Sequence, residues 1–310
     1  MGPGLVAMVK TTILLLTVLI AAAGGGCGGG GDAARSGKPS VFVSIEPLAY
    51  FAEQIGGSEF DIHVLVASAQ SPATYEPTAR QMTALAESKA FFTIGVPMEQ
   101  TLVPRLRSSM PAVRIVDTRG GIELIELESS GREHGHGATD PHIWLDPARA
   151  RMMAHNIYRA LADLEPDLEP VLAGNLRELN ADLDLLAAEL TGLLAPVRGR
   201  TIVVFHPAYG YFADAFELKQ VAIEAGGVTP GSKHLAEVVD MARARGVNAI
   251  FVQPQFSSAT ADAVAASIGA TVVNLDPMAR DYPENMRKIA GRIRSALQAA
   301  PSGIHPPGGQ

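Results

Sequence analysis

The sequence predicts an α/β protein with two Rossmann-like lobes, whose mostly parallel sheets are joined by one long rigid helix. Strand-like runs alternate with helical segments in the first half, and the same alternation returns after residue 199. A leucine stripe with heptad spacing lies between the two halves. Alternation of this kind is typical of a parallel sheet covered by helices on both faces. A chain of 310 residues that is 47% hydrophobic and 18% charged is large enough for two globular domains.

Short runs of β-branched and aromatic residues mark the expected strands. In the first half, the expected strands cover 41–45, 62–66, 91–94 and 113–116. In the second half, they cover 201–205, 220–223, 249–252 and 271–273. Helical spacing lies between them, for example over 78–89 and 98–108. We find no residue-level repeat that relates the two halves.

A leucine stripe predicts the helix between the lobes, over about 166–195 and roughly 45 Å long at the helical rise. Its members are Leu172, Leu176, Leu179, Leu183, Leu186, Leu190 and Leu193. A coiled-coil dimer is one interpretation of such a stripe. Because the stripe is short and lacks regular flanking charge pairs, we instead expect the helix to pack against the lobes of its own chain, in a monomer. Such a stiff helix permits only modest closure of the lobes.

The N-terminus has the pattern of an export signal. Lys10 precedes an apolar run over 11–23, which is too short to span a membrane comfortably and fits a signal peptide. The only cysteine, Cys27, follows this run, and we expect it to be lipidated and to anchor the protein to a membrane. The alternative is ordinary cleavage after 21–23. Either way, we expect a periplasmic or other extracytoplasmic location.

The net charge of −7 comes from 25 basic and 32 acidic residues and argues against nucleic acid as a partner. Binding to phosphate groups requires a concentrated basic face, and no Lys/Arg cluster occurs in the sequence.

Two histidines and one aspartate occupy matching positions at the ends of expected strands or just before a helix. His206 follows the strand at 201–205, Asp276 follows the last strand, and His142 precedes a helix expected from Pro147. Ligands of parallel α/β sheets bind beyond the carboxyl ends of the strands. We therefore expect these side chains to meet in the cleft between the lobes. Two imidazoles and a carboxylate suit a divalent ion such as zinc.

Other polar residues near this site have competing interpretations. Asp146 is expected to cap the helix that begins at the next residue. Asp140 is either a turn residue, which we favour, or a partner that orients His142. His134 and His136 lie in a glycine-rich loop that is either simply solvated or captures metal transiently. We expect structural roles for the remaining histidines, His63, His155, His234 and His305.

Six motifs carry a family resemblance. They cover 44–48, 75–78, 94–99, 140–147, 205–208 and 251–256. Through these motifs the chain resembles the zinc- and manganese-type substrate-binding proteins of bacterial ABC transporters, from about residue 40 to 298. The resemblance implies two α/β lobes joined by a long helix, one metal ion between them, and delivery of that ion to a membrane permease.

The resemblance also implies metal ligands, in that the family's second ligand falls on His142, its third on His206 and its carboxylate on Asp276. The family's first ligand is a histidine in a Ser-Pro-His-x-Tyr context, and here Ala73 takes its place. Alanine cannot bind metal. We hypothesise three protein ligands, completed by water or by one imidazole of the glycine-rich loop. Glu76 is a less favoured fourth ligand.

The preferred ion is zinc, because manganese-selective relatives tend to carry a carboxylate where this chain has His206. Manganese or ferrous iron is the second choice, because Ala73 removes one nitrogen ligand.

The sequence pattern predicts the domain boundaries, and the resemblance implies a receptor without enzymatic activity. The expected segments are a signal peptide (1–27), a flexible tether (28–39), an N-terminal metal-binding lobe (40–164), a linking helix (165–196), a C-terminal metal-binding lobe (197–299) and a disordered tail (300–310). The alternative function is a metal-dependent hydrolase, because three ligands and an open position suit catalysis. No His-Glu-x-x-His or Gly-x-Ser-x-Gly motif supports it. Surface adhesion, as described for some relatives, is a possible secondary role.

Overall fold

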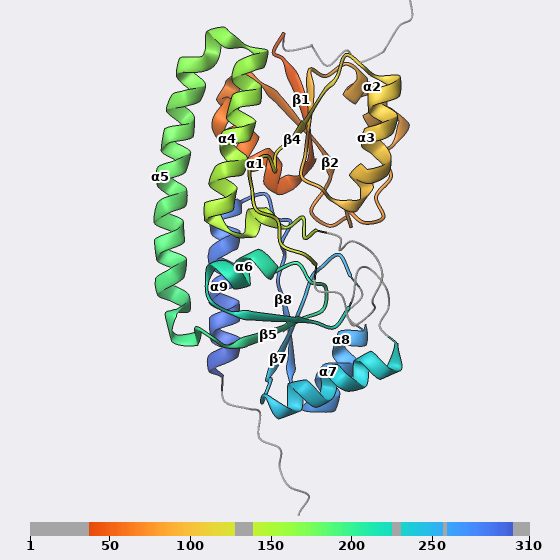
Figure 1. Cartoon of the computed structure of the whole chain (residues 1–310), viewed down its shortest axis with the longest axis vertical. Helices are drawn as coiled ribbons and strands as arrows, with labels where there is room; N and C mark the ends of the chain where they lie inside the picture. The colour runs from red at the N-terminus through yellow and green to blue at the C-terminus, as the bar shows by residue number, and fades with distance from the viewer. Residues whose placement is uncertain (1–36, 128–138, 225–230, 257–258, 300–310) are drawn as a thin grey trace, which may run out of the picture. The chain divides into compact units, whose positions relative to one another are not determined.

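The computed structural model describes residues 37–127, 139–224, 231–256 and 259–299 (Figure 1). They belong to one compact unit that begins at Gly37. The expected signal peptide, Cys27, most of the tether, and the C-terminal tail lie outside the described residues. None of the helices in the described part is both long and apolar enough to cross a membrane.

Two four-stranded parallel sheets confirm the predicted fold class (Figure 1). The first has the order β2-β1-β3-β4 and consists of β1 (Ser40–Ile45), β2 (Asp61–Val66), β3 (Ala90–Thr93) and β4 (Arg114–Asp117). The second has the order β6-β5-β7-β8 and consists of β5 (Thr201–Val204), β6 (Lys219–Ala222), β7 (Ala249–Val252) and β8 (Thr271–Asn274). Both halves therefore share one topology, which comparison of their residues did not reveal.

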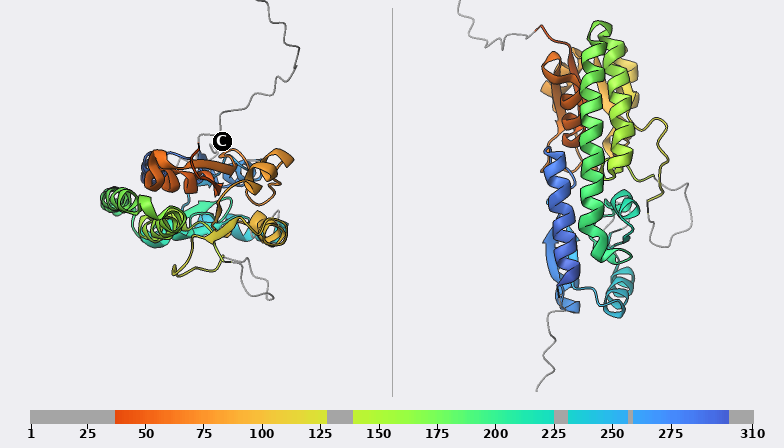
Figure 2. Two further views of the ribbon diagram at one scale, coloured as in Figure 1. Left: turned by 90° about the horizontal axis from the view of Figure 1, so that it is seen from above. Right: turned by 90° about the vertical axis from the view of Figure 1, so that its left-hand side faces the viewer.

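Helices connect the strands and cover the sheets. In the first half they are α1 (Glu46–Gly56), α2 (Ala79–Ala86), α3 (Pro97–Ser109) and α4 (Pro147–Leu164). In the second half they are α6 (Gly210–Ala215), α7 (Ser232–Ala244), α8 (Ala259–Ile268) and α9 (Tyr282–Gln298). The long α5 (Glu169–Leu194) joins the halves and lies beside α4 and α9 (Figures 1 and 2).

The predicted linking helix is confirmed, with its two ends in 3₁₀ conformation at Pro166–Leu168 and Ala195–Val197. Its leucine stripe packs against α1, α4 and α9 of the same chain, as expected. The prediction was wrong at the last position of the stripe, because Leu194 is buried whereas Leu193 is only half-buried. An α-helix has 3.6 residues per turn, so a strict heptad pattern drifts off the buried face and the next position takes over.

Burial along α5 gives a direct test of the stripe. Leu183 is 2% exposed and Leu185, two residues later, is 70% exposed. Leu183→Ala is expected to lower the free energy of unfolding by about 3 kcal/mol, because it leaves a cavity. The matched Leu185→Ala is expected to change it by less than about 0.5 kcal/mol. Urea unfolding measures both, and equal losses would contradict the assigned helix face.

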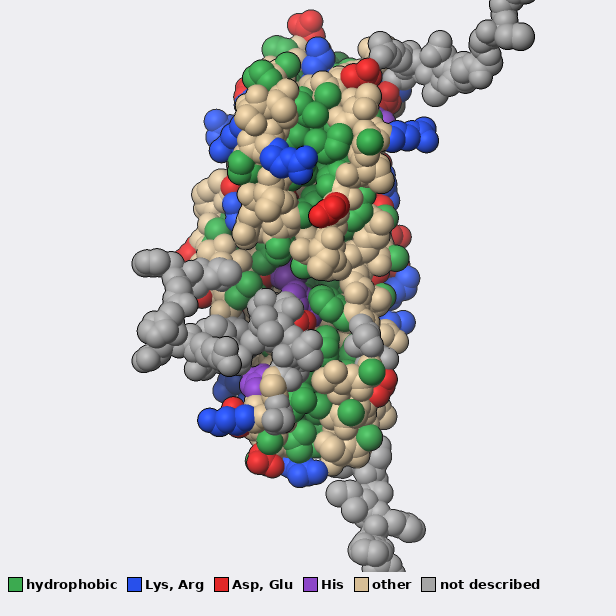
Figure 3. All heavy atoms as spheres, turned by 90° about the vertical axis from the view of Figure 1, so that its right-hand side faces the viewer, with side chains coloured by type: hydrophobic (Ala, Val, Ile, Leu, Met, Phe, Trp, Pro, Cys, Tyr) green, Lys and Arg blue, Asp and Glu red, His purple; other side chains and the backbone are tan. Residues whose placement is uncertain are grey.

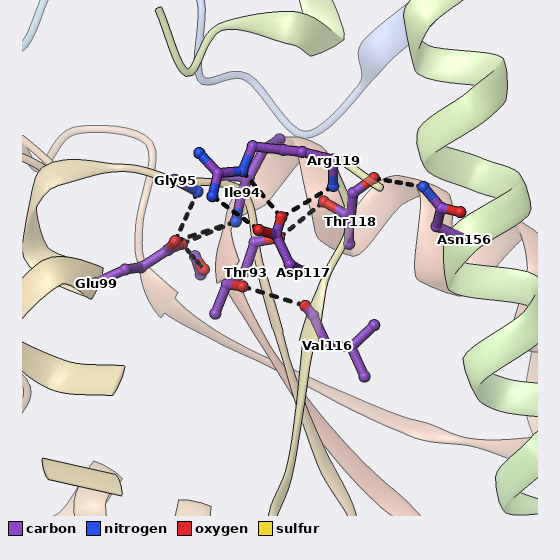
Figure 4. A network of polar contacts seen from close by, with 10 residues as sticks. Thr93, Ile94, Gly95, Glu99, Val116, Asp117, Thr118, Arg119 and Asn156 are labelled. Carbon is purple, nitrogen blue, oxygen red and sulfur yellow. Dashed lines mark hydrogen bonds and ion pairs between the residues drawn. The ribbon is translucent and has the colours of Figure 1, made fainter. Parts of the chain in front are cut away.

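A polar network closes the carboxyl edge of the first sheet (Figure 4). Glu99, in the first turn of α3, accepts hydrogen bonds from the backbone N–H groups of Ile94 at 3.0 Å and Gly95 at 2.6 Å, and from the Ser44 hydroxyl. Gly95 has a φ of 90°, and a Cβ there would lie 2.1 Å from Nη1 of Arg119. The positive φ favours glycine at this position, whereas the Arg119 side chain could move aside from a Cβ, so the backbone conformation is what requires Gly95.

Candidate metal centre

His142 lies in the segment between β4 and α4, and its ring is held by Asp140. The Asp140 carboxylate is 2% exposed. Its Oδ1 accepts the backbone N–H of His142 at 2.9 Å and lies 2.6 Å from Nδ1 of the ring. Asp140 therefore does both jobs that the sequence left as alternatives, forming the turn and orienting the imidazole. With the proton on Nδ1, the lone pair of Nε2 is available for a ligand.

His206 lies two residues beyond β5, and a second buried carboxylate holds its ring. Nδ1 of His206 is 3.2 Å from Oε2 of Glu224, which is 4% exposed. Phe256 stacks on the imidazole with ring centroids 4.8 Å apart. The Gln253 side-chain amide donates to the His206 carbonyl at 2.9 Å. This ring is therefore fixed in the same way as His142, with Nε2 left available.

The structure brings the two imidazoles together. Their ring centroids are 5.5 Å apart, and the rings meet edge-on at 75°. Trp144 packs beside His142 with a centroid distance of 5.2 Å. Figure 3 shows a histidine side chain in a hollow on one face of the molecule, bordered by hydrophobic side chains. The two imidazoles are thus neighbours in space, although they come from distant segments of the sequence.

Asp276 lies two residues beyond β8, and other donors already bind its carboxylate. Oδ1 accepts the Gln255 side-chain amide at 3.0 Å and the backbone N–H of Met278 at 2.9 Å. Across residues 37–127, 139–224, 231–256 and 259–299, no three His, Cys, Asp or Glu side chains are grouped closely enough to hold a metal ion. In this conformation, Asp276 therefore does not complete a three-ligand cage with the imidazole pair.

The remaining candidate residues either lie on other segments or are not among the described residues. Glu76 and Ala73 are exposed on the segment between β2 and α2. His134 and His136 lie outside the described residues. Asp146 caps α4 as predicted, accepting the Ala148 N–H at 2.8 Å.

Three histidines expected to be structural lie on regular elements. His63 packs on Phe42 from β2, His155 packs on Tyr158 within α4, and His234 lies in α7. His305 lies outside the described residues.

Hydrogen bonds tie the His142 segment to the second half of the chain. The Tyr211 hydroxyl donates to the Asp140 carbonyl at 3.0 Å and accepts the Ile125 N–H at 3.0 Å. The Trp144 indole donates to the Pro277 carbonyl at 2.8 Å. These bonds cross between segments far apart in sequence, so they fix His142 relative to β5 and β8.

Negative charge gathers around the imidazole pair. Asp140 and Glu224 are buried next to it, and Asp276 is half-buried near Tyr209. Burial raises the pKa of Tyr209 well above its ordinary value, and the Asp276 charge acts in the same direction. The phenol therefore stays neutral, and the carboxylates dominate the local field, which favours a cation.

Sequence analysis missed Glu224. Its signal was available, because Glu224 follows directly after the strand expected at 220–223, as His206 follows the strand expected at 201–205. The residue's neighbours in the sequence gave no hint that its partner would be His206, because strand register sets that contact.

Comparison with solved structures shows the class of protein. A crystal structure of ZnuA matches with a TM-score of 0.79 and 36% identity, over 84% of this chain and all of that one. The laminin-binding protein Lmb of Streptococcus agalactiae, described as a bifunctional protein with adhesin and metal transporting activity, matches with a TM-score of 0.73 and 25% identity over 84% of this chain and all of that one. The fold is thus that of the metal-binding, substrate-binding proteins of ABC transporters, which the motifs indicated.

The family follows from the sequence. The sequence model of ZnuA, the periplasmic zinc-uptake complex component A, matches residues 41–296, and the chain belongs to this family. The zinc-binding lipoprotein AdcA of Streptococcus pneumoniae is 26% identical over 253 residues, which are 78% of this chain and 50% of that protein. The chain thus spans about half the length of this curated relative.

Proposed function

We propose that this chain is an extracytoplasmic receptor that captures one zinc ion through His142, His206 and Asp276 and delivers it to an ABC permease. The observation that carries the proposal is the imidazole pair, with centroids 5.5 Å apart and a carboxylate behind each ring. The relatives add that AdcA is a zinc-binding lipoprotein and that ZnuA is a zinc-uptake component. The receptor acts as a monomer anchored through Cys27 and carries out no catalysis.

The spacing of the pair suits one shared zinc ion. Zinc–nitrogen bonds of about 2.0–2.1 Å, a ring radius of about 1.1 Å and a tetrahedral angle place two imidazole centroids about 5 Å apart. The observed separation is 5.5 Å. Capture thus requires only a small movement of the two rings.

Asp276 is the proposed third ligand, through Oδ2, because Oδ1 already accepts two hydrogen bonds. In this proposal, the Asp276 carboxylate moves toward the imidazole pair when the ion binds. Water, or His134 or His136, takes the fourth position, and Glu76 is a less favoured choice. Manganese and ferrous iron are weaker alternatives, because two imidazoles favour the softer ion.

Metal-linked stability tests this function. Adding zinc to metal-free protein at about 100 times the Kd is expected to stabilise the fold by about 2.7 kcal/mol. For a protein of this size, that corresponds to a rise of roughly 5–10 °C in Tm. Magnesium at the same concentration is the control and is expected to leave the Tm unchanged. An unchanged Tm with zinc would contradict the proposed receptor function.

The alternative function, a metal-dependent hydrolase, would be favoured if the protein hydrolysed esters or peptides and lost this activity in His206→Ala.

The missing ligand gives a second test. Ala73 is exposed in a turn in which the Ser71 carbonyl accepts the Thr74 N–H at 3.2 Å. Ala73→His is expected to lower the zinc Kd at least about 10-fold, because it restores a nitrogen ligand. Thr74→His, one residue away and also exposed, is the matched control and is expected to have little effect. Competition with a chromophoric chelator measures both, and equal Kd values for Ala73→His and wild type would count against this geometry.

A surface-adhesion role is a second candidate, favoured by the likeness to Lmb. Saturable binding of the purified chain to immobilised laminin would support it, and binding no greater than to an albumin-coated surface would exclude it.

A further inference from the structure

Glu224 is fixed beside His206 by the backbone of the second sheet. The ladder between β5 and β6 continues past its last paired strand residues, because Ile223 donates to the Val204 carbonyl at 2.9 Å and Glu224 donates to the Phe205 carbonyl at 2.8 Å. His206 follows Phe205 directly. Strand register therefore places the carboxylate next to the imidazole, independently of any flexible segment.

The Glu224 carboxylate is poorly compensated. It is 4% exposed, and Oε2 is 3.2 Å from Nδ1 of His206. Within the described part of the chain, its buried Oε1 has no hydrogen-bond partner. The equally buried Glu99, by contrast, is met by two backbone N–H groups and the Ser44 hydroxyl. A buried carboxylate with so few donors is costly unless positive charge lies close by.

A divalent cation bound to Nε2 of His206 would supply this positive charge, which would act on the Glu224 carboxylate through the imidazole ring. A carboxylate on the far nitrogen of a metal-binding imidazole fixes its tautomer and orientation and raises its basicity. We propose that Glu224 is a positioning residue of the zinc site, which holds the proton of His206 on Nδ1 and turns Nε2 toward the ion. This inference rests on the proposed function and adds a residue to it.

Replacing Glu224 tests how a carboxylate orients a metal-binding imidazole more directly than replacing Asp140 does. Asp140 also accepts the backbone N–H of His142 at 2.9 Å, so replacing it disrupts a turn as well as a ring contact. The Glu224 side chain contacts His206, whereas its backbone N–H donates to the Phe205 carbonyl, so a side-chain substitution leaves the backbone bond intact.

The experiment compares Glu224→Ala and Glu224→Gln with wild type. Glu237, 62% exposed and paired with Lys233 on α7, provides the matched control Glu237→Gln. Chelator competition is expected to show a zinc Kd about 10- to 100-fold higher in Glu224→Ala and about 5- to 10-fold higher in Glu224→Gln. Glutamine keeps an oxygen that accepts from Nδ1–H but loses the charge, so it separates orientation from electrostatics.

Imidazole ¹⁵N NMR of the metal-free proteins provides a readout that overall folding does not move. In wild type, His206 is expected to carry its proton on Nδ1, and in Glu224→Ala the two tautomers are expected to mix. A wild-type Kd together with an unchanged tautomer in Glu224→Ala overturns the inference. If that variant does not fold, a wild-type Kd in Glu224→Gln overturns it. Should wild type bind no zinc while the tautomer still shifts in Glu224→Ala, the proposed function fails, and only the control of the His206 tautomer by Glu224 remains.

Discussion

His206→Ala is expected to raise the Kd for zinc about 100- to 10,000-fold, since each ligand contributes roughly a quarter to a third of the 10–16 kcal/mol typical of structural zinc sites. His142→Ala is expected to have an effect of the same size, because the two rings are direct neighbours, with centroids 5.5 Å apart. Elemental analysis of the purified proteins checks both variants, with one zinc per chain expected in wild type and none in either variant.

His155→Ala is the matched control. His155 is exposed on α4, and its ring packs on Tyr158 with a centroid distance of 5.9 Å rather than on His142 or His206. It is expected to retain one zinc per chain. Full zinc occupancy in both His142→Ala and His206→Ala would show that the ion binds elsewhere.

Glu99→Ala is expected to lower the free energy of unfolding by about 4 kcal/mol. The substitution leaves the N–H groups of Ile94 and Gly95 and the hydroxyl of Ser44 without their acceptor in a buried place. Figure 4 shows the N–H groups of Ile94 and Gly95 directed at the Glu99 carboxylate. The control is Glu123→Ala, at an exposed position, with an expected change below about 0.5 kcal/mol. Similar losses from both variants in urea unfolding would show that the network adds little.

The same carboxyl adds a pH dependence. Burial raises the pKa of Glu99 above its ordinary 4.5, although Ser44, the two N–H groups and the Arg119 charge act in the opposite direction. The folded protein therefore holds this proton more tightly than the unfolded chain does. Stability from Glu99 is greatest below the unfolded pKa and declines as pH rises through the folded pKa. In Glu99→Gln this decline is expected to disappear, and urea unfolding between pH 4.5 and 7 measures it.

Local patterns predicted the fold well because strands and helices follow short-range periodicity. The eight predicted strands all exist, within one or two residues of their expected ends. The helix expected over 78–89 instead ends at Ala86, because the Ser88 hydroxyl and backbone N–H both bond to the Leu85 carbonyl and close the last turn. Such side-chain competition with the backbone is hard to predict from spacing alone.

The site was harder to predict because it depends on contacts between distant segments. The end of an expected strand pointed to His206, and the start of an expected helix pointed to His142. They did not reveal that Asp140 serves both turn and ring, nor that Glu224 faces His206 through the register of β5 and β6. They also did not show that Gln255 and Met278 donate to Oδ1 of Asp276, which leaves only Oδ2 for a metal.

The bonds from Tyr211 and Trp144 have a consequence for speed of capture. They fasten the His142 segment to the second sheet before any ion arrives. Folding, rather than ion capture, therefore bears the entropic penalty of ordering the two nitrogen donors. In the proposed receptor, two ligands are already in place when the ion arrives, so the association rate is expected to approach the diffusional encounter rate. Variants with lower affinity are therefore expected to differ from wild type mainly by a higher dissociation rate constant.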